Sequence, residues 1–136
     1  MLAIVDSGPL YAVTDTDDED HEASLAALRR TDLQLVIPVL VIAEVTYIVG
    51  RRLGATAEAR FLRGLELFEI EAPAPDDWAR IAELVERYQD FPLGGTDASV
   101  VALAERLGSE VVITLDRRHF AALEPRHCEA FQLLPE

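Results

Sequence analysis

The stretch Leu2-Ala-Ile-Val-Asp-Ser-Gly-Pro-Leu-Tyr-Ala-Val-Thr14 joins a short apolar run directly to the start of a helix. Residues 2–6 have the length and composition of a buried strand, and Ser7, Gly8 and Pro9 favour a turn that leads into a helix. A strand followed at once by a helix is typical of proteins in which the two kinds of element alternate.

Strand-like and helix-like segments alternate along the rest of the chain. Apolar runs predict further strands at residues 33–37, 68–72, 111–116 and 131–135. Amphipathic or capped segments predict helices at residues 9–14, 15–30, 38–50, 56–67, 75–89, 96–108 and 117–123. This order implies a single α/β domain over residues 1–136, with a mainly parallel central sheet flanked by helices on both faces.

The composition indicates a compact but strongly acidic protein. The chain has 136 residues, half of them hydrophobic, and a chain of this size buries roughly 68–70% of its unfolded surface. Its formal net charge is −13, and every basic residue is arginine. Because an acidic surface repels phosphates, simple electrostatic binding of nucleic acid is not expected. The charge suits a protein that attracts cations or a basic partner.

The sequence favours a cytoplasmic location without a membrane segment. The longest apolar region, Leu33–Val49, is interrupted by Gln34, Pro38 and Glu44, so no transmembrane span is expected. The N-terminus has no basic leader typical of a signal peptide. The single cysteine, Cys128, cannot form an internal disulfide, which fits a reducing compartment, and we interpret it as a small, partly buried hydrophobic residue.

A glutamate interrupts the apolar helix that is predicted over Pro38–Gly50. Helical spacing gives Glu44 apolar neighbours one turn before it and one turn after it. We therefore expect its carboxylate to be buried. Burying an unpaired carboxylate costs several kcal/mol or forces it to stay protonated, so Glu44 requires a partner.

Topology directs four acidic residues to the same edge of the predicted sheet. Asp6 and Asp116 end the first and fourth strands, and Asp97 lies in the first turn of the helix that returns to the fourth strand. Glu44 lies about two turns inside another helix that begins at this edge. In parallel α/β folds, ligands bind outside the carboxyl ends of the strands. We expect these four carboxylates to form a functional site.

Three of the four acids also have a structural explanation when they are considered alone, whereas the apolar helix face gives Glu44 no obvious structural role. Asp6 could cap the turn before Pro9, and Asp97 could be a helix N-terminal acid with Thr96 as the cap. Asp116 could lie in a surface turn and pair with the arginines that follow it. Jointly, the four residues favour a site more strongly than any one of them.

A cluster of carboxylates requires a cation. Two carboxylates about 5 Å apart repel by roughly 3 kcal/mol at an effective dielectric of 20. Oxygen ligands without neighbouring histidine or cysteine suit Mg²⁺ or Mn²⁺ rather than Zn²⁺, and such sites typically handle phosphates. A metal would keep Glu44 ionised. His21 and His119 lie in polar segments that we expect to be exposed, so neither is expected to be a catalytic base.

Other acidic sites on this kind of sheet match the sequence poorly. Response-regulator receivers and haloacid-dehalogenase-like phosphatases typically need a lysine beside the phosphorylated aspartate, and the chain has none. The phosphatase pattern also places an aspartate where this chain has Gly8. Residues 15–26 lack the glycine and the final glutamate of an EF-hand loop, with Asp20 and Ala26 at those positions.

Four motifs in the order found here resemble those of the PIN-domain ribonucleases, and in particular the VapC-type toxins of bacterial toxin–antitoxin pairs. The motifs are IVDSGPLYA at residues 4–12, VIAEVTYIV at 41–49, GGTDASVVALAERLG at 94–108 and VITLDRRHF at 112–120. They extend over nearly the whole chain. Any one motif is weak, whereas the ordered set is specific.

The resemblance implies a PIN-like α/β/α sandwich and assigns roles to individual residues. Asp6 and Asp97 would be the principal metal ligands, and Glu44 and Asp116 would complete the catalytic pocket. Hydroxyl groups that often support such pockets would come from Ser7 and Thr114.

The resemblance also implies an activity and partners. The protein would be a Mg²⁺- or Mn²⁺-dependent endoribonuclease that leaves 5′-phosphate and 3′-hydroxyl ends. It would be neutralised by a VapB-like antitoxin and would form homodimers through helices near the N-terminal half. Candidates for gripping phosphate or an antitoxin tail are Arg51, Arg52, Arg117 and Arg118, which could equally be solvated surface charges. The alternative is a non-catalytic PIN-like scaffold that binds metal or RNA.

Overall fold

A computed structural model describes all 136 residues of the chain. The strands are β1 (Leu2–Val5), β2 (Gln34–Pro38), β3 (Glu69–Glu71), β4 (Val111–Ile113) and β5 (Gln132–Leu134). The α-helices are α1 (Ser7–Thr14), α2 (His21–Leu28), α3 (Val39–Leu53), α4 (Ala55–Gly64), α5 (Asp77–Arg87), α6 (Gly95–Leu107) and α7 (Arg117–Ala122), and a 3₁₀ helix, η1, spans Leu65–Leu67. No helix combines the length and the apolar character that crossing a membrane requires.

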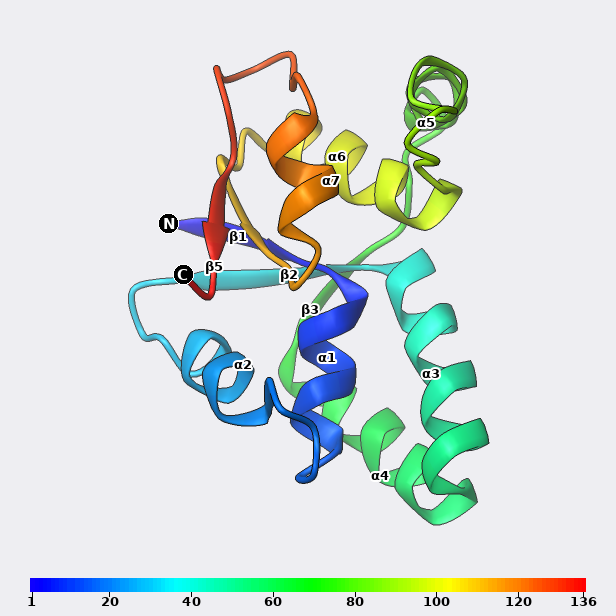
Figure 1. The fold of residues 1–136 in the computed structure, drawn as a ribbon, viewed down its shortest axis with the longest axis vertical. Helices are drawn as coiled ribbons and strands as arrows, with labels where there is room; N and C mark the ends of the chain where they lie inside the picture. The colour runs from blue at the N-terminus through cyan, green and yellow to red at the C-terminus, as the bar shows by residue number, and fades with distance from the viewer.

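The strands form one parallel sheet in the order β3-β2-β1-β4-β5 (Figure 1). In the centre of the sheet, Ala3 of β1 pairs with Leu35 of β2 on one side and Val111 of β4 on the other. The chain first builds outward from β1 to β3 and then returns to place β4 on the other side of β1. The strand order therefore reverses between β1 and β4, which is where open α/β sheets bind ligands.

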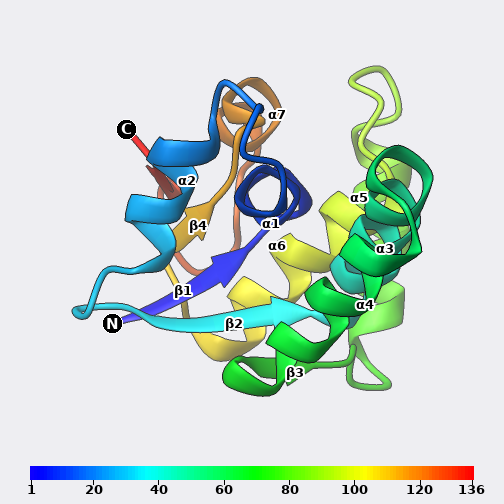
Figure 2. The same cartoon turned by 90° about the horizontal axis from the view of Figure 1, so that it is seen from below.

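Helices cover both faces of the sheet. Helices α1 to α4 lie on one side and helices α5 to α7 lie on the other (Figures 1 and 2). Connections between parallel strands are right-handed, so the helices move to the opposite face where the order in which strands are added across the sheet reverses. The predicted sandwich of two helical layers around a parallel sheet is confirmed.

The hydrophobic core lies on both sides of the central strands. Ala3, Ile4 and Val5 of β1 are fully buried, and all three residues of β4 are buried. Helix α6 is buried continuously over residues 98–104, which explains its apolar sequence on every side. It ends at Leu107, and Gly108 caps it with a positive φ of 71°, a conformation that glycine adopts without strain.

Several element boundaries differ from the prediction. The acidic segment 15–20 forms turns instead of a helix start, because the side chains of Asp15 and Asp18 accept hydrogen bonds from the backbone two residues later. Pro38 ends β2 and caps α3 instead of being its first helical residue. The segment expected as one helix over residues 56–67 divides into α4 and η1.

Candidate functional site

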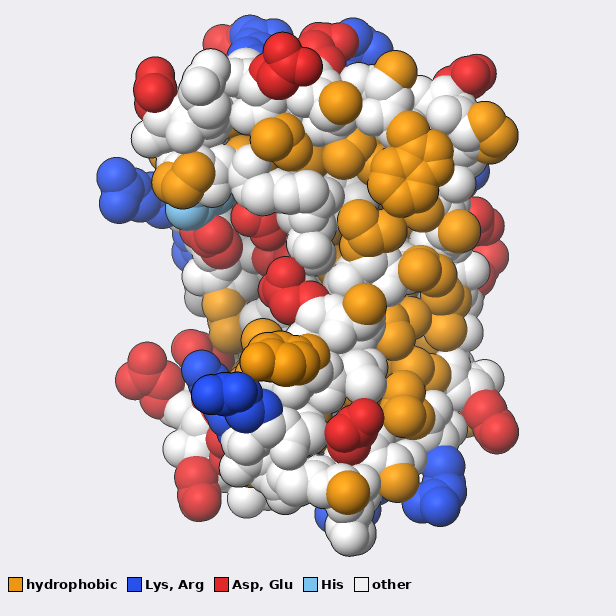
Figure 3. Space-filling model, turned by 90° about the vertical axis from the view of Figure 1, so that its right-hand side faces the viewer, with side chains coloured by type: hydrophobic (Ala, Val, Ile, Leu, Met, Phe, Trp, Pro, Cys, Tyr) orange, Lys and Arg blue, Asp and Glu red, His pale blue; other side chains and the backbone are white.

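The structure brings the four predicted acids into one pocket. The pocket has a volume of about 730 Å³ and opens at the carboxyl ends of β1 and β4. Figure 3 shows acidic side chains inside a hollow, with basic side chains at its margin. The pocket is lined by Asp6, Ser7, Gly8, Glu44, Gly94, Gly95, Thr96, Asp97, Leu115 and Asp116.

Asp6 forms the floor of the pocket. It follows β1 directly, caps α1 and is only 5% exposed. Its backbone N–H donates to the carbonyl of Ile113, 2.9 Å away, which continues the pairing of β1 with β4. The hydroxyl of Thr114 donates to Asp6 Oδ2 at 2.7 Å and accepts from the N–H of Asp116 at 3.0 Å. Thr114 therefore connects two of the predicted acids.

Burial shifts the protonation equilibrium of Asp6. The pKa of Asp6 is raised to about 7, mainly because burial desolvates its carboxylate. The charges of Asp97 and Glu44 also act to raise it, whereas the hydrogen bond from Thr114 acts to lower it. The other carboxylate oxygen, Oδ1, is buried without a hydrogen-bond partner, and so is the hydroxyl of Ser7. Buried polar atoms without partners are costly, so the floor of the pocket suits a cation that contacts these oxygens.

Asp97 and Asp116 also line the pocket, and each is presented by the start of a helix. Asp97 is in the first turn of α6, where burial raises its pKa, and the charges of Asp116 and Glu44 add to the effect. Asp116 caps α7, and its side chain accepts the backbone N–H of His119. The strand β4 ends at Ile113, so Asp116 lies beyond the strand that was expected to end with it.

Gly8 allows these two parts of the chain to approach. A side chain at position 8 would place its Cβ 3.2 Å from the Cβ of Leu115. The first turn of α1 therefore packs directly against the segment between β4 and Asp116. This close contact keeps the segment after β1 beside the segment after β4.

Glu44 lines the pocket, but the prediction that it is buried is wrong. Glu44 is exposed, and its neighbour Tyr47 is 65% exposed. The face of α3 that packs into the core carries Val41, Val45 and Val49, all of them fully buried. Ile42 and Ile48 pack partly buried against this core, whereas Val39, Ala43 and Leu53 are open to solvent with Tyr47. Glu44 therefore needs no metal to offset burial.

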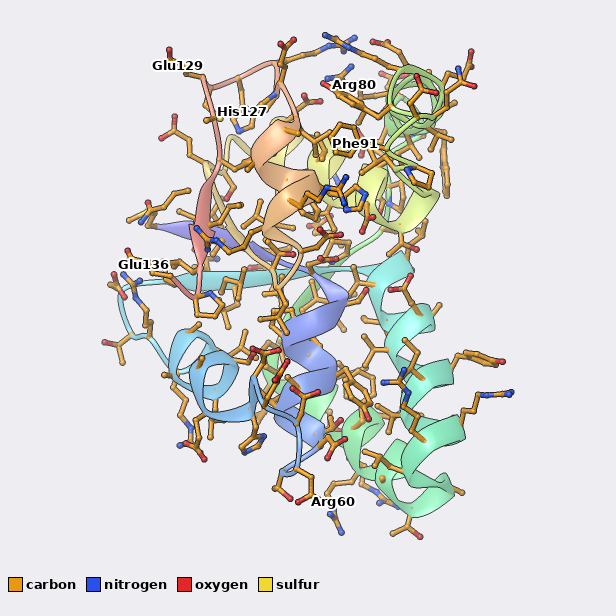
Figure 4. The ribbon with its side chains drawn as sticks, in the orientation of Figure 1. Arg60, Arg80, Phe91, His127, Glu129 and Glu136 are labelled. Carbon is orange, nitrogen blue, oxygen red and sulfur yellow. The ribbon has the colours of Figure 1, made fainter.

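The histidines are less exposed than expected. His21 is partly buried, and its Nδ1 lies 2.8 Å from the carbonyl of Ala12. His119 is partly buried between Asp116 and the carbonyl of Phe91. Phe91 lies in the loop between α5 and α6 (Figure 4). The hydrogen bond to Asp116, followed by that to Phe91, raises the pKa of His119.

His119 was not predicted as a site residue. Its signal in the sequence is the spacing Asp116-Arg-Arg-His119, which places the two side chains on adjacent positions of one helical turn. Its second contact involves a residue 28 positions away and could not be read from this spacing.

The predicted arginines occupy different environments. Arg117 donates from Nη1 to the carbonyls of Leu133 and Pro135, so its guanidinium holds the C-terminal strand. Arg118 is exposed and has no side-chain partner among the hydrogen bonds or ion pairs of the structure.

At the end of α3, the arginines contact tyrosines. Arg51 donates to the hydroxyl of Tyr47 at 3.3 Å, and the guanidinium of Arg52 lies 5.2 Å from the ring centre of Tyr11.

The donor set of the pocket fits a hard divalent cation. The available donors are carboxylate and hydroxyl oxygens, which Mg²⁺ and Mn²⁺ prefer. No group of three or more acidic, histidine or cysteine side chains is already placed to hold a metal. Mutual repulsion of the carboxylates favours such a spread.

Comparison with known proteins agrees with the fold and the order of the motifs. The family model of the PIN domain matches residues 3–124. Ribonuclease VapC26 of Mycobacterium tuberculosis is 35% identical over 134 residues, which cover 97% of this chain and 99% of that protein.

Solved structures share the fold at low sequence identity. VapC20 of M. tuberculosis, a toxin that cleaves the sarcin–ricin loop, has a TM-score of 0.74 and 18% identity over 81% of this chain and 86% of that one. VapBC2 from Rickettsia felis, bound to a DNA fragment from its promoter, has a TM-score of 0.72 and 14% identity over 98% of each chain.

A parallel sheet between two helical layers, with carboxylates at the point where the strand order reverses, defines an α/β/α protein with an acidic pocket. The match over most of the chain identifies the family within this class. The chain belongs to the PIN-domain family and, within it, to the VapC type.

Proposed function

We propose that this protein is a cytoplasmic endoribonuclease toxin that hydrolyses RNA phosphodiester bonds at the acidic pocket and is neutralised by a cognate VapB-like antitoxin. The likeness to a VapC ribonuclease over nearly the full length supports the reaction class. Nucleases of this family are metal-dependent. The observation that carries the proposal is the gathering of Asp6, Glu44, Asp97 and Asp116 in a single pocket.

We assign metal binding and catalysis to the four carboxylates, with Mg²⁺ or Mn²⁺ as the metal. When bound, the cation would lower the pKa of a water molecule, orient the scissile phosphate and stabilise charge on the leaving oxygen. Asp6 and Asp97 would be the main ligands, because both are shielded from water and their pKa values are raised by burial. Glu44 and Asp116 would complete the ligand set from the rim.

Two hydroxyl groups and one arginine would support the reaction. Thr114 would fix the rotamer of Asp6 through its 2.7 Å hydrogen bond. The unpartnered Ser7 hydroxyl would point its oxygen toward the cation or a metal-bound water. Arg118 would contact the RNA backbone, because it follows the pocket residue Asp116 by two positions, is exposed and has no competing acceptor. Arg117 is not assigned an RNA contact, because its guanidinium binds carbonyls of the C-terminal segment.

The antitoxin would supply a basic segment. The net charge of −13 and the carboxylates of the pocket attract arginine or lysine side chains. Such a segment would occupy the place of the cation or the RNA and so block cleavage. Solved complexes of related fold include a toxin–antitoxin pair from Klebsiella pneumoniae, at 22% identity and a TM-score of 0.65 over 89% of this chain and 92% of that one.

A homodimer would bury the exposed apolar face beside the pocket. Tyr47 on α3 is 65% exposed and Trp78 at the start of α5 is 52% exposed. Figure 3 shows hydrophobic side chains in a continuous band on the side of the molecule formed by α3 and α5. Large apolar bands on monomers typically mark protein contacts. The interface would therefore combine α3, from the N-terminal half, with α5.

The experiment that tests the proposed function compares RNA cleavage by the wild type and Asp97→Asn. Total and structured RNAs are incubated with Mg²⁺ or Mn²⁺, with and without chelator. We expect discrete cuts with 5′-phosphate and 3′-hydroxyl ends that disappear with chelator and with the substitution. Cuts that persist in both controls would contradict the proposal. Metal binding without cleavage of any RNA would favour the non-catalytic scaffold.

A further inference from the structure

His119, which does not itself line the pocket, joins the pocket residue Asp116 to the loop between α5 and α6. Nδ1 of His119 lies 2.8 Å from Oδ1 and 2.7 Å from Oδ2 of Asp116, and Nε2 lies 2.7 Å from the carbonyl oxygen of Phe91. The imidazole also packs edge-on against the Phe91 ring, with the ring centres 5.4 Å apart. The side chain is therefore fixed at both ends and on one face.

The partners of His119 determine which atoms carry protons. A carboxylate and a carbonyl oxygen are acceptors only, so each ring nitrogen must donate a proton to form its hydrogen bond. Both nitrogens of His119 are donors in this arrangement. With both nitrogens engaged in this way, His119 is placed to hold its two neighbours in position.

The loop that His119 holds leads directly into the pocket. Within the loop, the N–H of Phe91 donates to the carbonyl of Tyr88 at 2.9 Å. The chain then passes through Gly94, which lines the pocket and caps α6, to Asp97 in the first helical turn. The bond from His119 to Phe91 thus restrains the segment that presents Asp97.

The other end of His119 restrains Asp116. This residue lies beyond the last strand residue, Ile113, so the sheet does not hold its position. Its backbone N–H is held by Thr114, whereas both oxygens of its carboxylate face Nδ1 of His119. Without the imidazole, the carboxylate would rotate more freely at the rim of the pocket.

We propose that His119 is a positioning residue that ties the Asp116 carboxylate to the loop before α6, so that Asp97 and Asp116 keep a fixed spacing across the pocket. The proposal rests on the proposed function, because the spacing matters only if these carboxylates act together on a cation. Residues that orient metal ligands typically contribute 10–100-fold to metal affinity or activity. His119 acts through Asp116 and Asp97 and does not itself touch the RNA.

The test uses three substitutions that separate the two hydrogen bonds. His119→Ala removes both, His119→Asn keeps a donor at the position of Nδ1, and His119→Gln keeps one at the position of Nε2. His21→Ala is the matched control, because His21 also bonds a backbone carbonyl, Ala12, but lies outside the pocket.

The readouts are kcat and KM for RNA cleavage, with Mn²⁺ affinity from titration calorimetry. For His119→Ala we expect a roughly 10–100-fold lower kcat, a KM close to the wild-type value and Mn²⁺ binding weakened by about tenfold. His119→Asn and His119→Gln each keep only one of the two bonds and so break the tie between Asp116 and the loop. We therefore expect both variants to show most of this loss, and His21→Ala to match the wild type. Unfolding in urea shows whether each variant is folded under the assay conditions.

Failure of this proposal is distinguishable from failure of the proposed function. Wild-type kcat and Mn²⁺ affinity in a folded His119→Ala protein would overturn the positioning role, while loss of cleavage in Asp97→Asn would still support the nuclease. If the wild type cleaves no RNA, the proposed function fails, and the Mn²⁺ titrations alone decide the role of His119. Wild-type kcat and Mn²⁺ affinity in the Asn or the Gln variant would also overturn it, because a single bond would then be sufficient and the tie between Asp116 and the loop would be unnecessary.

Discussion

The hydroxyl of Thr114 donates to Asp6 at 2.7 Å and at the same time accepts the backbone N–H of Asp116 at 3.0 Å. One fully buried side chain therefore sets the relative position of the segments that follow β1 and β4. The strand order reverses at this point, so the relationship is a direct consequence of the sheet topology.

Thr114→Val should reduce stability and activity together. Valine has a similar shape but cannot donate to Asp6 or accept from Asp116, so buried polar groups lose their partners at a cost of about 1–3 kcal/mol. We expect the free energy of unfolding in urea to fall by this amount and RNA cleavage to fall as well. Thr114→Ser retains the hydroxyl and is the control. A Val variant with wild-type stability would contradict the role of Thr114.

Asp6→Asn should stabilise the metal-free protein while it removes metal binding. The substitution eliminates a buried carboxylate that is repelled by Asp97 and Glu44. With chelator present near pH 8, we expect a gain of about 1–3 kcal/mol in urea unfolding, comparable with other replacements of buried charges. Added Mn²⁺ should then raise the urea concentration at the midpoint of unfolding for the wild type but not for Asp6→Asn. If Asp6→Asn were less stable than the wild type, the buried Asp6 carboxylate would not be destabilising the metal-free protein, which would contradict this account.

The neighbouring arginines Arg117 and Arg118 should have separable effects. Arg118→Ala removes a phosphate contact, so the slope of log affinity for RNA against log salt should decrease by about 0.7. Arg117→Ala removes the bonds to the carbonyls of Leu133 and Pro135 and should cost about 1 kcal/mol in stability, with the salt slope unchanged. RNA binding is measured with metal-free protein in the presence of chelator, so that the RNA stays uncleaved. An unchanged slope in Arg118→Ala would mean that Arg118 is a solvated surface charge that does not contact the RNA.

A buried ion pair should make stability depend on pH. Glu105 accepts hydrogen bonds from Arg80 at 2.8 and 2.9 Å, and the two side chains are 10% and 8% exposed. Burial acts to raise the pKa of Glu105, but the bonds from Arg80 and from the N–H of Arg126 outweigh it, so the pKa lies below its usual value of 4.5.

The sign of the pH effect follows from this lowered pKa. The pair contributes its full stability above about pH 4.5, and the contribution is lost as the pH falls through the folded-state pKa of Glu105. Glu105→Gln should therefore cost on the order of 2–3 kcal/mol at pH 7 and much less near pH 3. Urea unfolding at several pH values measures the difference. A cost that does not change with pH would contradict this account.

The fold and the positions of two acids follow from local sequence. Asp6 and Asp116 come directly or shortly after apolar runs, and parallel strands place their carboxyl ends at one edge. The position of Asp97 could be predicted in the same way, because its helix begins at that edge of the sheet.

Features that depend on tertiary packing could not be predicted in this way. Helix α3 is apolar on more than one face, and its periodicity does not reveal that Val45 faces the core while Tyr47 faces solvent. The expectation of a buried Glu44 failed for this reason. The contact of His119 with Phe91 depends on how a distant loop packs against α7.

The central claim is that the four carboxylates bind a divalent cation, and Mn²⁺ titration calorimetry on metal-free protein tests it most directly. The wild type is compared with Asp97→Asn and with Glu86→Gln, which removes an exposed carboxylate outside the pocket. We predict saturable binding to the wild type and to Glu86→Gln, with affinity at least tenfold weaker in Asp97→Asn. Equal binding to all three proteins, or none to the wild type, would contradict the account.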